Sequence, residues 1–114
     1  MADTLARLSA VVAARGMEVL AIIDHSAKAR EVGIDLRDST LVVFGSPSAA
    51  APVIQAAPLA ALDLPLRVIV WNDGDHTLLS YSAPAAVARR YGVGGDLAAV
   101  FASVEAIVTT VIDR

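Results

Sequence analysis

The chain has 114 residues, of which nine are basic and twelve acidic, giving a net charge of −3. This length fits a single domain over residues 1–114, and no run of Lys or Arg exceeds two residues, so we expect no nucleic acid partner. Cysteine is absent, which excludes disulfide bonds, thiolate catalysis and cysteine-ligated zinc.

Apolar residues make up 56% of the chain. A domain this small and this apolar often covers part of its surface with a second copy of itself, so we expect a homodimer. The first residues, Met1–Thr4, lack the order of a secretory signal. The apolar stretch Leu97–Ile112 is shorter than the roughly 20 residues that cross a bilayer. We therefore expect a cytoplasmic protein with no membrane partner.

The first two predicted elements are a helix and a strand. Asp3 or Thr4 caps the helix and Gly16 ends it. One side of this helix is apolar at helical spacing, through Leu5, Leu8, Val11 and Val12. Residues Glu18–Asp24 then read as a strand that is apolar on both faces, a pattern typical of strands covered on both sides.

Two short helices flank a second predicted strand. Ser26 starts a helix over Ala27–Val32, and Thr40–Phe44 forms a well-buried strand. The dipeptide Ser46-Pro47 is a strong helix start, because a capping side chain precedes proline at the first helical position. Pro58 stops that helix.

The last part of the chain predicts a hairpin followed by two helices. Leu66–Trp71 is a third buried strand, Asn72–Asp75 turns the chain, and Thr77–Tyr81 pairs back antiparallel. A helix over Pro84–Arg90 precedes the final helix. The final helix has an apolar stripe formed by Leu97, Val100, Phe101, Val104, Ile107, Val108 and Val111. Together these elements predict an α+β fold, with a mixed, mainly four-stranded sheet that contains one hairpin and is covered by helices.

Short polar motifs interrupt three apolar segments where strands begin or end. They are Asp24-His25, Gly45-Ser46-Pro47 and Asp63 within Leu62–Pro65. Strand ends are the usual place for a site on a scaffold of helices and strands, so we expect the three motifs to meet around one cleft. The expected ligand-binding residues of this cleft are His25, Phe44, Ser46, Asp63 and Trp71.

Each of these residues also has a purely structural interpretation. His25 is either an acid–base group or a structural histidine, and Ser46 is either a helix cap alone or a cap beside a bound anion. Asp63 is either an anchor or a site residue, with Arg30, Arg37 and Arg67 as possible partners. Trp71 is either a core residue or the edge of a site or dimer contact.

Two further kinds of site are poorly supported by the sequence. The two histidines, His25 and His76, lie far apart in a chain without cysteine, so we expect no metal site. Gly45-Ser46 resembles a nucleophilic serine turn, but Ser48 stands where the second glycine would be. The sequence identifies no catalytic residue and no cofactor.

The motifs resemble one family when they are taken in order. The segments that carry the resemblance are Asp24-His25, Arg30–Ile34, Thr40–Pro47, Leu62–Leu66 and Trp71. In this combination the chain resembles the bacterial and archaeal domain-of-unknown-function family 302, from the first helix to about residue 92. The resemblance implies a small α/β fold and dimeric assembly, and it brings no activity. The chain departs from the family pattern at Ser46, where asparagine is typical, and at Ala83, where an acidic residue or asparagine is typical.

Three functional hypotheses follow. The first is a cytoplasmic homodimer that binds a small polar or anionic ligand in a cleft at the strand ends. The second is an enzyme that uses His25 as general acid or base, with Asp63 or Glu31 as its partner. The third is an interaction module without a ligand, whose final helix, Leu97–Ile112, forms the interface.

Overall fold

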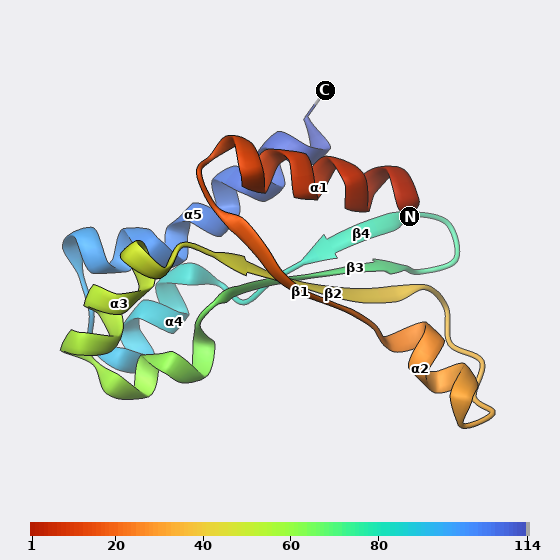
Figure 1. Cartoon of the computed structure of the whole chain (residues 1–114), viewed down its shortest axis with the longest axis horizontal. Coiled ribbons are helices and arrows are strands. Elements are labelled where there is room, and N and C mark those ends of the chain that lie inside the picture. The colour runs from red at the N-terminus through yellow and green to blue at the C-terminus, as the bar shows by residue number, and fades with distance from the viewer. Residues whose placement is uncertain (114) are drawn as a thin grey trace.

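The computed structural model describes residues 1–113 (Figure 1). Four strands form one sheet, and the helices gather along one face and at the two ends of the strands. The elements in chain order are α1 (Ala2–Ala14), β1 (Glu18–Asp24), α2 (His25–Glu31), β2 (Ser39–Gly45), α3 (Pro47–Ala56), the 3-10 helix η1 (Pro58–Asp63), β3 (Leu66–Asn72), β4 (Thr77–Ser80), α4 (Pro84–Tyr91) and α5 (Gly95–Ile112).

The α+β class, the four strands and the β3–β4 hairpin are confirmed. The expectation of a mixed sheet is wrong, because the strands run in the order β1-β2-β3-β4 and every neighbouring pair is antiparallel. A helix between two strands often crosses the sheet and makes them parallel. Here α2 lies beyond one end of the sheet and α3 with η1 beyond the other, so each connection returns the chain beside the strand it left (Figure 1).

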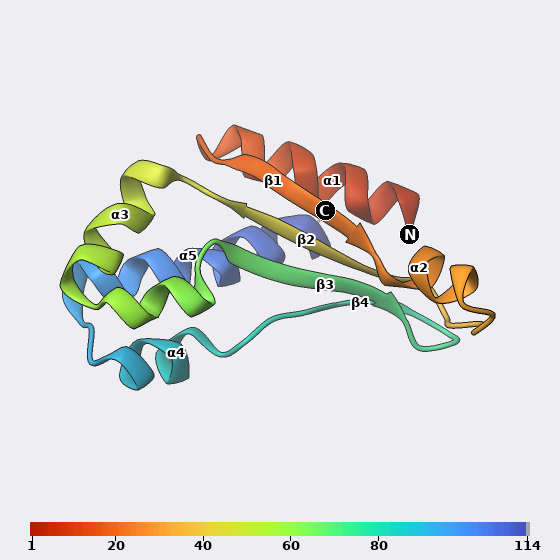
Figure 2. The same ribbon diagram turned by 60° about the horizontal axis from the view of Figure 1, so that its bottom comes forward.

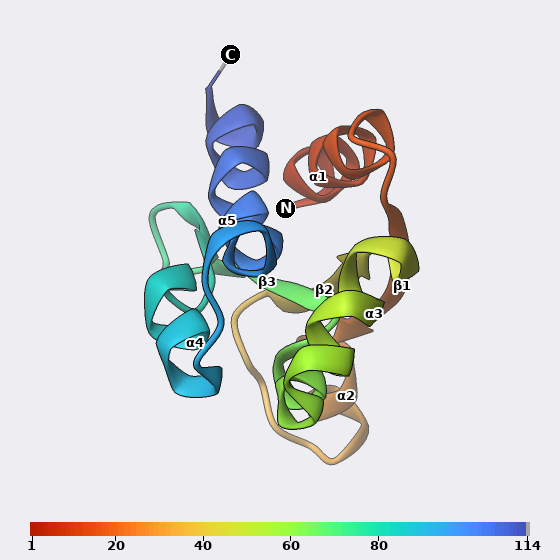
Figure 3. The same ribbon diagram turned by 90° about the vertical axis from the view of Figure 1, so that its left-hand side faces the viewer.

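Helices α1 and α5 cover the same face of the sheet (Figure 3). Every second residue of β2 points toward them, and Thr40, Val42 and Phe44 are buried there. The two helices contribute the other half of the core, which includes Leu8, Val12, Phe101, Val104, Ile107, Val108 and Val111. The Arg7 guanidinium donates a hydrogen bond to the carbonyl oxygen of Val111, which ties the first helix to the last.

Helix α5 has the apolar stripe that its sequence predicts. Among residues 1–113 it is also the one helix that is long and apolar enough to cross a membrane, judged by length and composition alone. Its stripe, however, contacts the sheet and α1 and forms part of the core. This packing is that of a core helix, and it leaves the buried stripe unavailable as the interface of the third hypothesis.

The expectation that β1 is buried on both faces is wrong. β1 is an edge strand with β2 as its only strand neighbour in the described sheet, and most of its residues are exposed. Leu20, Ile22 and Ile23 are 46%, 57% and 38% exposed. Strand β1 therefore has apolar side chains that residues 1–113 leave exposed to solvent.

Helix α2 begins at His25, two residues before the predicted start at Ala27. Asp24, not Ser26, is the N-cap, and its carboxylate accepts hydrogen bonds from the Ala27 amide at 2.9 Å and from the Ser26 hydroxyl at 2.6 Å. These bonds hold the pKa of Asp24 below its ordinary value, with the Ser26 hydroxyl as the largest cause. The side chains of Asp24 and Ser26 are therefore held by local hydrogen bonds at the start of α2.

Candidate functional site

The three polar motifs do not meet. Strands β1 and β2 are antiparallel, so Glu18 lies opposite Gly45 and Asp24 lies opposite Thr40. The Asp24-His25 motif is therefore a full strand length, roughly 20 Å, from the Gly45-Ser46-Pro47 motif. The expectation of one cleft among all three motifs is wrong, because it took no account of the direction of β1.

The other two motifs do meet, around a cavity of about 480 Å³ that we call the Pro47 cavity. Most of its wall is apolar, and the larger apolar side chains are Met17, Leu20, Pro47, Leu64, Pro65, Leu66 and Val100. The polar side chains are Ser46, Asp96 and Ser103. Ser46 lines this cavity, whose wall is far less polar than that of the expected cleft.

Small residues and one irregular strand make room for the Pro47 cavity. Gly45, Ala49, Ala50 and Ala99 line it with little side-chain volume. A Cβ at Gly45 would lie 3.5 Å from the Pro65 Cβ, so the backbone of β2 runs close against the 64–65 segment. The register of β1 shifts at Leu20, and bulges of this kind re-aim a side chain. Leu20 belongs to the cavity wall.

Ser46 is the N-cap of α3 by position, but its hydroxyl makes no capping bond to the backbone. It pairs instead with the Ser48 hydroxyl at 2.9 Å. The prediction of a proline start at α3 is confirmed. The prediction that Ser46 caps the helix through its side chain is wrong, and its hydroxyl lies at the wall of the Pro47 cavity.

Asp63 is the centre of a polar cluster at the same end of the sheet. One carboxylate oxygen accepts from Arg67 at 2.8 Å, and the other accepts from Arg90 at 2.9 Å and from the Tyr91 hydroxyl. The Tyr91 hydrogen bond is the largest cause that holds the pKa of Asp63 below its ordinary value, and the two arginines act in the same direction. The same hydrogen bond raises the pKa of Tyr91.

These contacts make Asp63 an anchor that joins η1 to β3 and α4. Arg67 is one of the partners that the sequence predicts. The sequence does not predict Arg90 and Tyr91, because they lie 27 and 28 residues further along the chain and only the packing of α4 brings them near. An adjacent pair of arginines at a helix end, Arg89-Arg90, was the one available signal, and it also fits interaction with the helix carbonyls.

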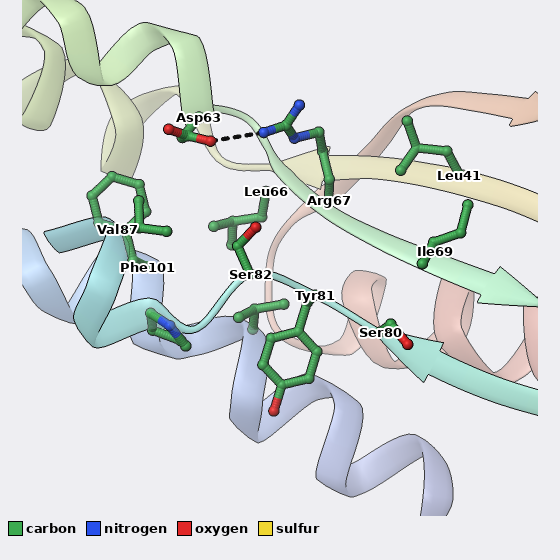
Figure 4. A pocket seen from close by; sticks show the side chains of 12 residues that line it. Leu41, Asp63, Leu66, Arg67, Ile69, Ser80, Tyr81, Ser82, Val87 and Phe101 are labelled. Atoms are coloured by element: carbon green, nitrogen blue, oxygen red, sulfur yellow. Dashed lines mark hydrogen bonds and ion pairs between the residues drawn. The ribbon is translucent and has the colours of Figure 1, made fainter. Parts of the chain in front are cut away.

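A second hollow, of about 440 Å³, opens beside Asp63 and is called the Asp63 hollow here (Figure 4). Leu41 and Ile69 approach it from neighbouring strands, and Phe101 and Val104 of α5 line its depth. The hydroxyls of Ser80 and Ser82 are further lining groups. Figure 4 shows the Asp63–Arg67 pair above the side chains of Leu66 and Val87.

The remaining expected site residues lie outside both hollows. Phe44 is fully buried in the core. His25 is exposed in the first turn of α2. Trp71 is half-buried, and its indole Nε1 donates to the Ser80 hydroxyl at 2.9 Å. Within residues 1–113, no group of three or more His, Cys, Asp or Glu side chains is placed to hold a metal ion.

Comparison with known proteins adds a solved structure and two curated relatives. An uncharacterized conserved DUF302 protein from Bacillus stearothermophilus has the same fold, with a TM-score of 0.83 and 23% identity, covering 100% of this chain and 89% of that one. Proteins named "Fluoride-specific ion channel FluC 1" from Brucella suis and Brucella abortus are 35% identical over 95 residues, or 82% of this chain. The chain spans only 37% and 35% of their lengths.

The family comparison covers almost every residue. The family described as "Domain of unknown function DUF302" matches residues 1–111, which includes all the motifs that carried the resemblance. The chain belongs to the DUF302 family.

Proposed function

We propose that this protein is a cytoplasmic, homodimeric ligand-binding module whose ligand occupies the Pro47 cavity. The observation that carries the proposal is the cavity itself, formed where the 45–47 and 64–65 segments meet α5. Its volume of about 480 Å³ falls within the range of small-molecule sites. Two of the predicted motifs contribute to the wall of this cavity.

The chemistry of the wall supports a largely apolar ligand in place of the expected polar or anionic one. Apolar surface that a ligand removes from water contributes roughly 25 cal/mol per Å². The Asp96 carboxylate disfavours an anion and accepts hydrogen bonds from a hydroxyl or an ammonium group. The ligand class is therefore a small apolar molecule that carries one hydroxyl or amino group.

The enzyme alternative has less support from the geometry. His25 is the first residue of α2 and Glu31 is the last, so about 9 Å of helix rise separates them. Asp63 belongs to the opposite end of the sheet and is held by Arg67, Arg90 and Tyr91. A general acid–base pair needs groups within hydrogen-bond reach of one substrate.

The curated relatives suggest a setting for such a module. They carry the name of a fluoride-specific ion channel, and this chain matches about a third of their length. We propose that the matched third is an attached module outside the conducting part. The one helix of membrane-spanning length among residues 1–113 packs in the core, so we assign no ion conduction to this chain.

Filling the cavity tests the proposal. Ala99 lines the Pro47 cavity, whereas Ala102, also exposed on α5, does not. The probe is N-phenyl-1-naphthylamine, an apolar fluorescent amine, titrated into the wild-type protein, Ala99→Leu and the matched control Ala102→Leu. We expect saturable binding with one probe per chain, weakened at least about tenfold by Ala99→Leu, or about 1.4 kcal/mol. Ala102→Leu should bind like wild type. Absence of saturable binding, or equal affinity for all three proteins, contradicts the proposal.

A further inference from the structure

The sheet face opposite α1 and α5 is largely apolar. We call it the open face and define it by strand alternation and register as Glu18, Ala21, Ile23, Ser39, Leu41, Val43, Gly45, Arg67, Ile69, Trp71, Leu78 and Ser80. Leu41 lies between Ile23 and Ile69 across the three strands, and Trp71 lies opposite Leu78. In Figure 2, which brings this side forward, the strands run across the view with no helix in front of their middle.

Two polar side chains of the open face are already paired, and its other charged residue, Glu18, lies at the start of the edge strand β1. Arg67 binds the Asp63 carboxylate at 2.8 Å. The Ser80 hydroxyl accepts the Trp71 indole N–H at 2.9 Å. Covering this face would therefore remove mainly apolar surface from water and leave few polar groups without a partner.

The two faces of strand β2 differ in how far they are covered. Strands that are apolar on both faces normally have cover on both sides. In β2, Val42 and Phe44 face α5 and are covered, whereas Leu41 and Val43 on the other face remain partly exposed.

We infer that the open face is covered by the open face of a second copy of this chain. This inference rests on the homodimer of the proposed function and names its interface. The solved DUF302 protein has this fold over 89% of its chain. A second copy is available to every such chain.

Two properties of the open face fit pairing with itself. A two-fold interface brings the same patch of both copies together, so a strongly charged patch would repel itself. The open face carries one residue of each charge, Glu18 and Arg67, and the Asp63 carboxylate of the same chain neutralises Arg67. The Asp63 hollow, with Leu41 and Ile69 at its side, also offers a recess of about 440 Å³ for a side chain of the partner.

The first experiment uses the unmodified chain. Trp71 is the only tryptophan and belongs to the open face. In a face-to-face dimer its indole is shielded, so dilution should shift its fluorescence emission to longer wavelength. The shift should follow the fall in mass from twice 11.8 kDa toward 11.8 kDa, measured by sedimentation equilibrium. An emission maximum that stays constant while the mass halves contradicts the open-face interface.

The second experiment uses charge at Ile69. Ile69→Glu and Ile69→Lys should each weaken dimerisation at least about 100-fold, and an equimolar mixture should recover a dimer through opposite charges, which also shows that both variants fold. Ile112→Glu is the matched control, because Ile112 is 60% exposed at the end of α5 on the covered side. It should leave the mass unchanged.

The outcomes separate the two proposals. A wild-type chain that is monomeric at every concentration overturns the homodimer and the interface together. A wild-type dimer that Ile69→Glu leaves intact overturns only the open-face interface. Binding of N-phenyl-1-naphthylamine to the Pro47 cavity is measured in a separate titration, so neither of these results decides it.

Discussion

Asp63 is the residue whose role changes most between sequence and structure. Its carboxylate accepts three side-chain hydrogen bonds and is only 13% exposed. Its neighbours in sequence, Leu62 and Leu64, give no indication of Arg90 or Tyr91 as partners. A residue's chemistry can be predicted from its type, but partners that packing brings together from distant segments cannot.

We predict that Asp63→Asn destabilises the protein by about 1–3 kcal/mol at pH 7, because the variant loses charge-assisted hydrogen bonds. The folded-state pKa of Asp63 is lowered, so its stabilisation is fully present above its unfolded value, about 3.9. That stabilisation is lost as the pH falls through the folded value. Urea unfolding at pH 7, 5 and 3 should therefore show the two proteins converging at low pH. The exposed Asp35→Asn serves as control, and a difference that grows with acid would contradict this account.

At the scale of elements, local patterns predicted the helices well and the environment of the strands poorly. The stripe of α5 is buried as its spacing indicates, and proline marks the starts of α3 and α4. The 3-10 helix η1 was missed, because Pro58 was interpreted only as the end of a helix. The burial of β1 was wrong because alternation gives the faces of a strand and says nothing about its position in the sheet.

The role of α5 as a core helix leads to a prediction with two isoleucines. Ile107 is fully buried and Ile112 is 60% exposed on the same helix. Ile107→Ala should cost about 2–5 kcal/mol of unfolding free energy, from lost burial and the cavity that remains. Ile112→Ala should change it by no more than about 0.5 kcal/mol. Chemical denaturation measures both variants. If Ile107→Ala and Ile112→Ala lower the unfolding free energy by similar amounts, α5 does not pack as described.

At the scale of the whole molecule, the proposed dimer links stability to concentration. Because folding and association are coupled, the melting temperature should rise by about 3 °C for each tenfold increase in protein concentration. Differential scanning calorimetry over two decades of concentration measures this directly. The Ile69→Glu variant should show no such dependence, while Ile112→Glu should follow wild type. A melting temperature that is independent of concentration in wild type contradicts a dimer coupled to folding.

Helix α5 has two flanks with different neighbours. Phe101 and Val104 belong to the core, while Ala99, Val100 and Ser103 line the Pro47 cavity. That wall therefore stands on the helical side of the sheet, away from the surface through which two copies would join. Assembly and ligand binding then use largely different residues, although Leu66 lines both the Pro47 cavity and the Asp63 hollow. A dimer would therefore bind two ligand molecules, one in the Pro47 cavity of each subunit.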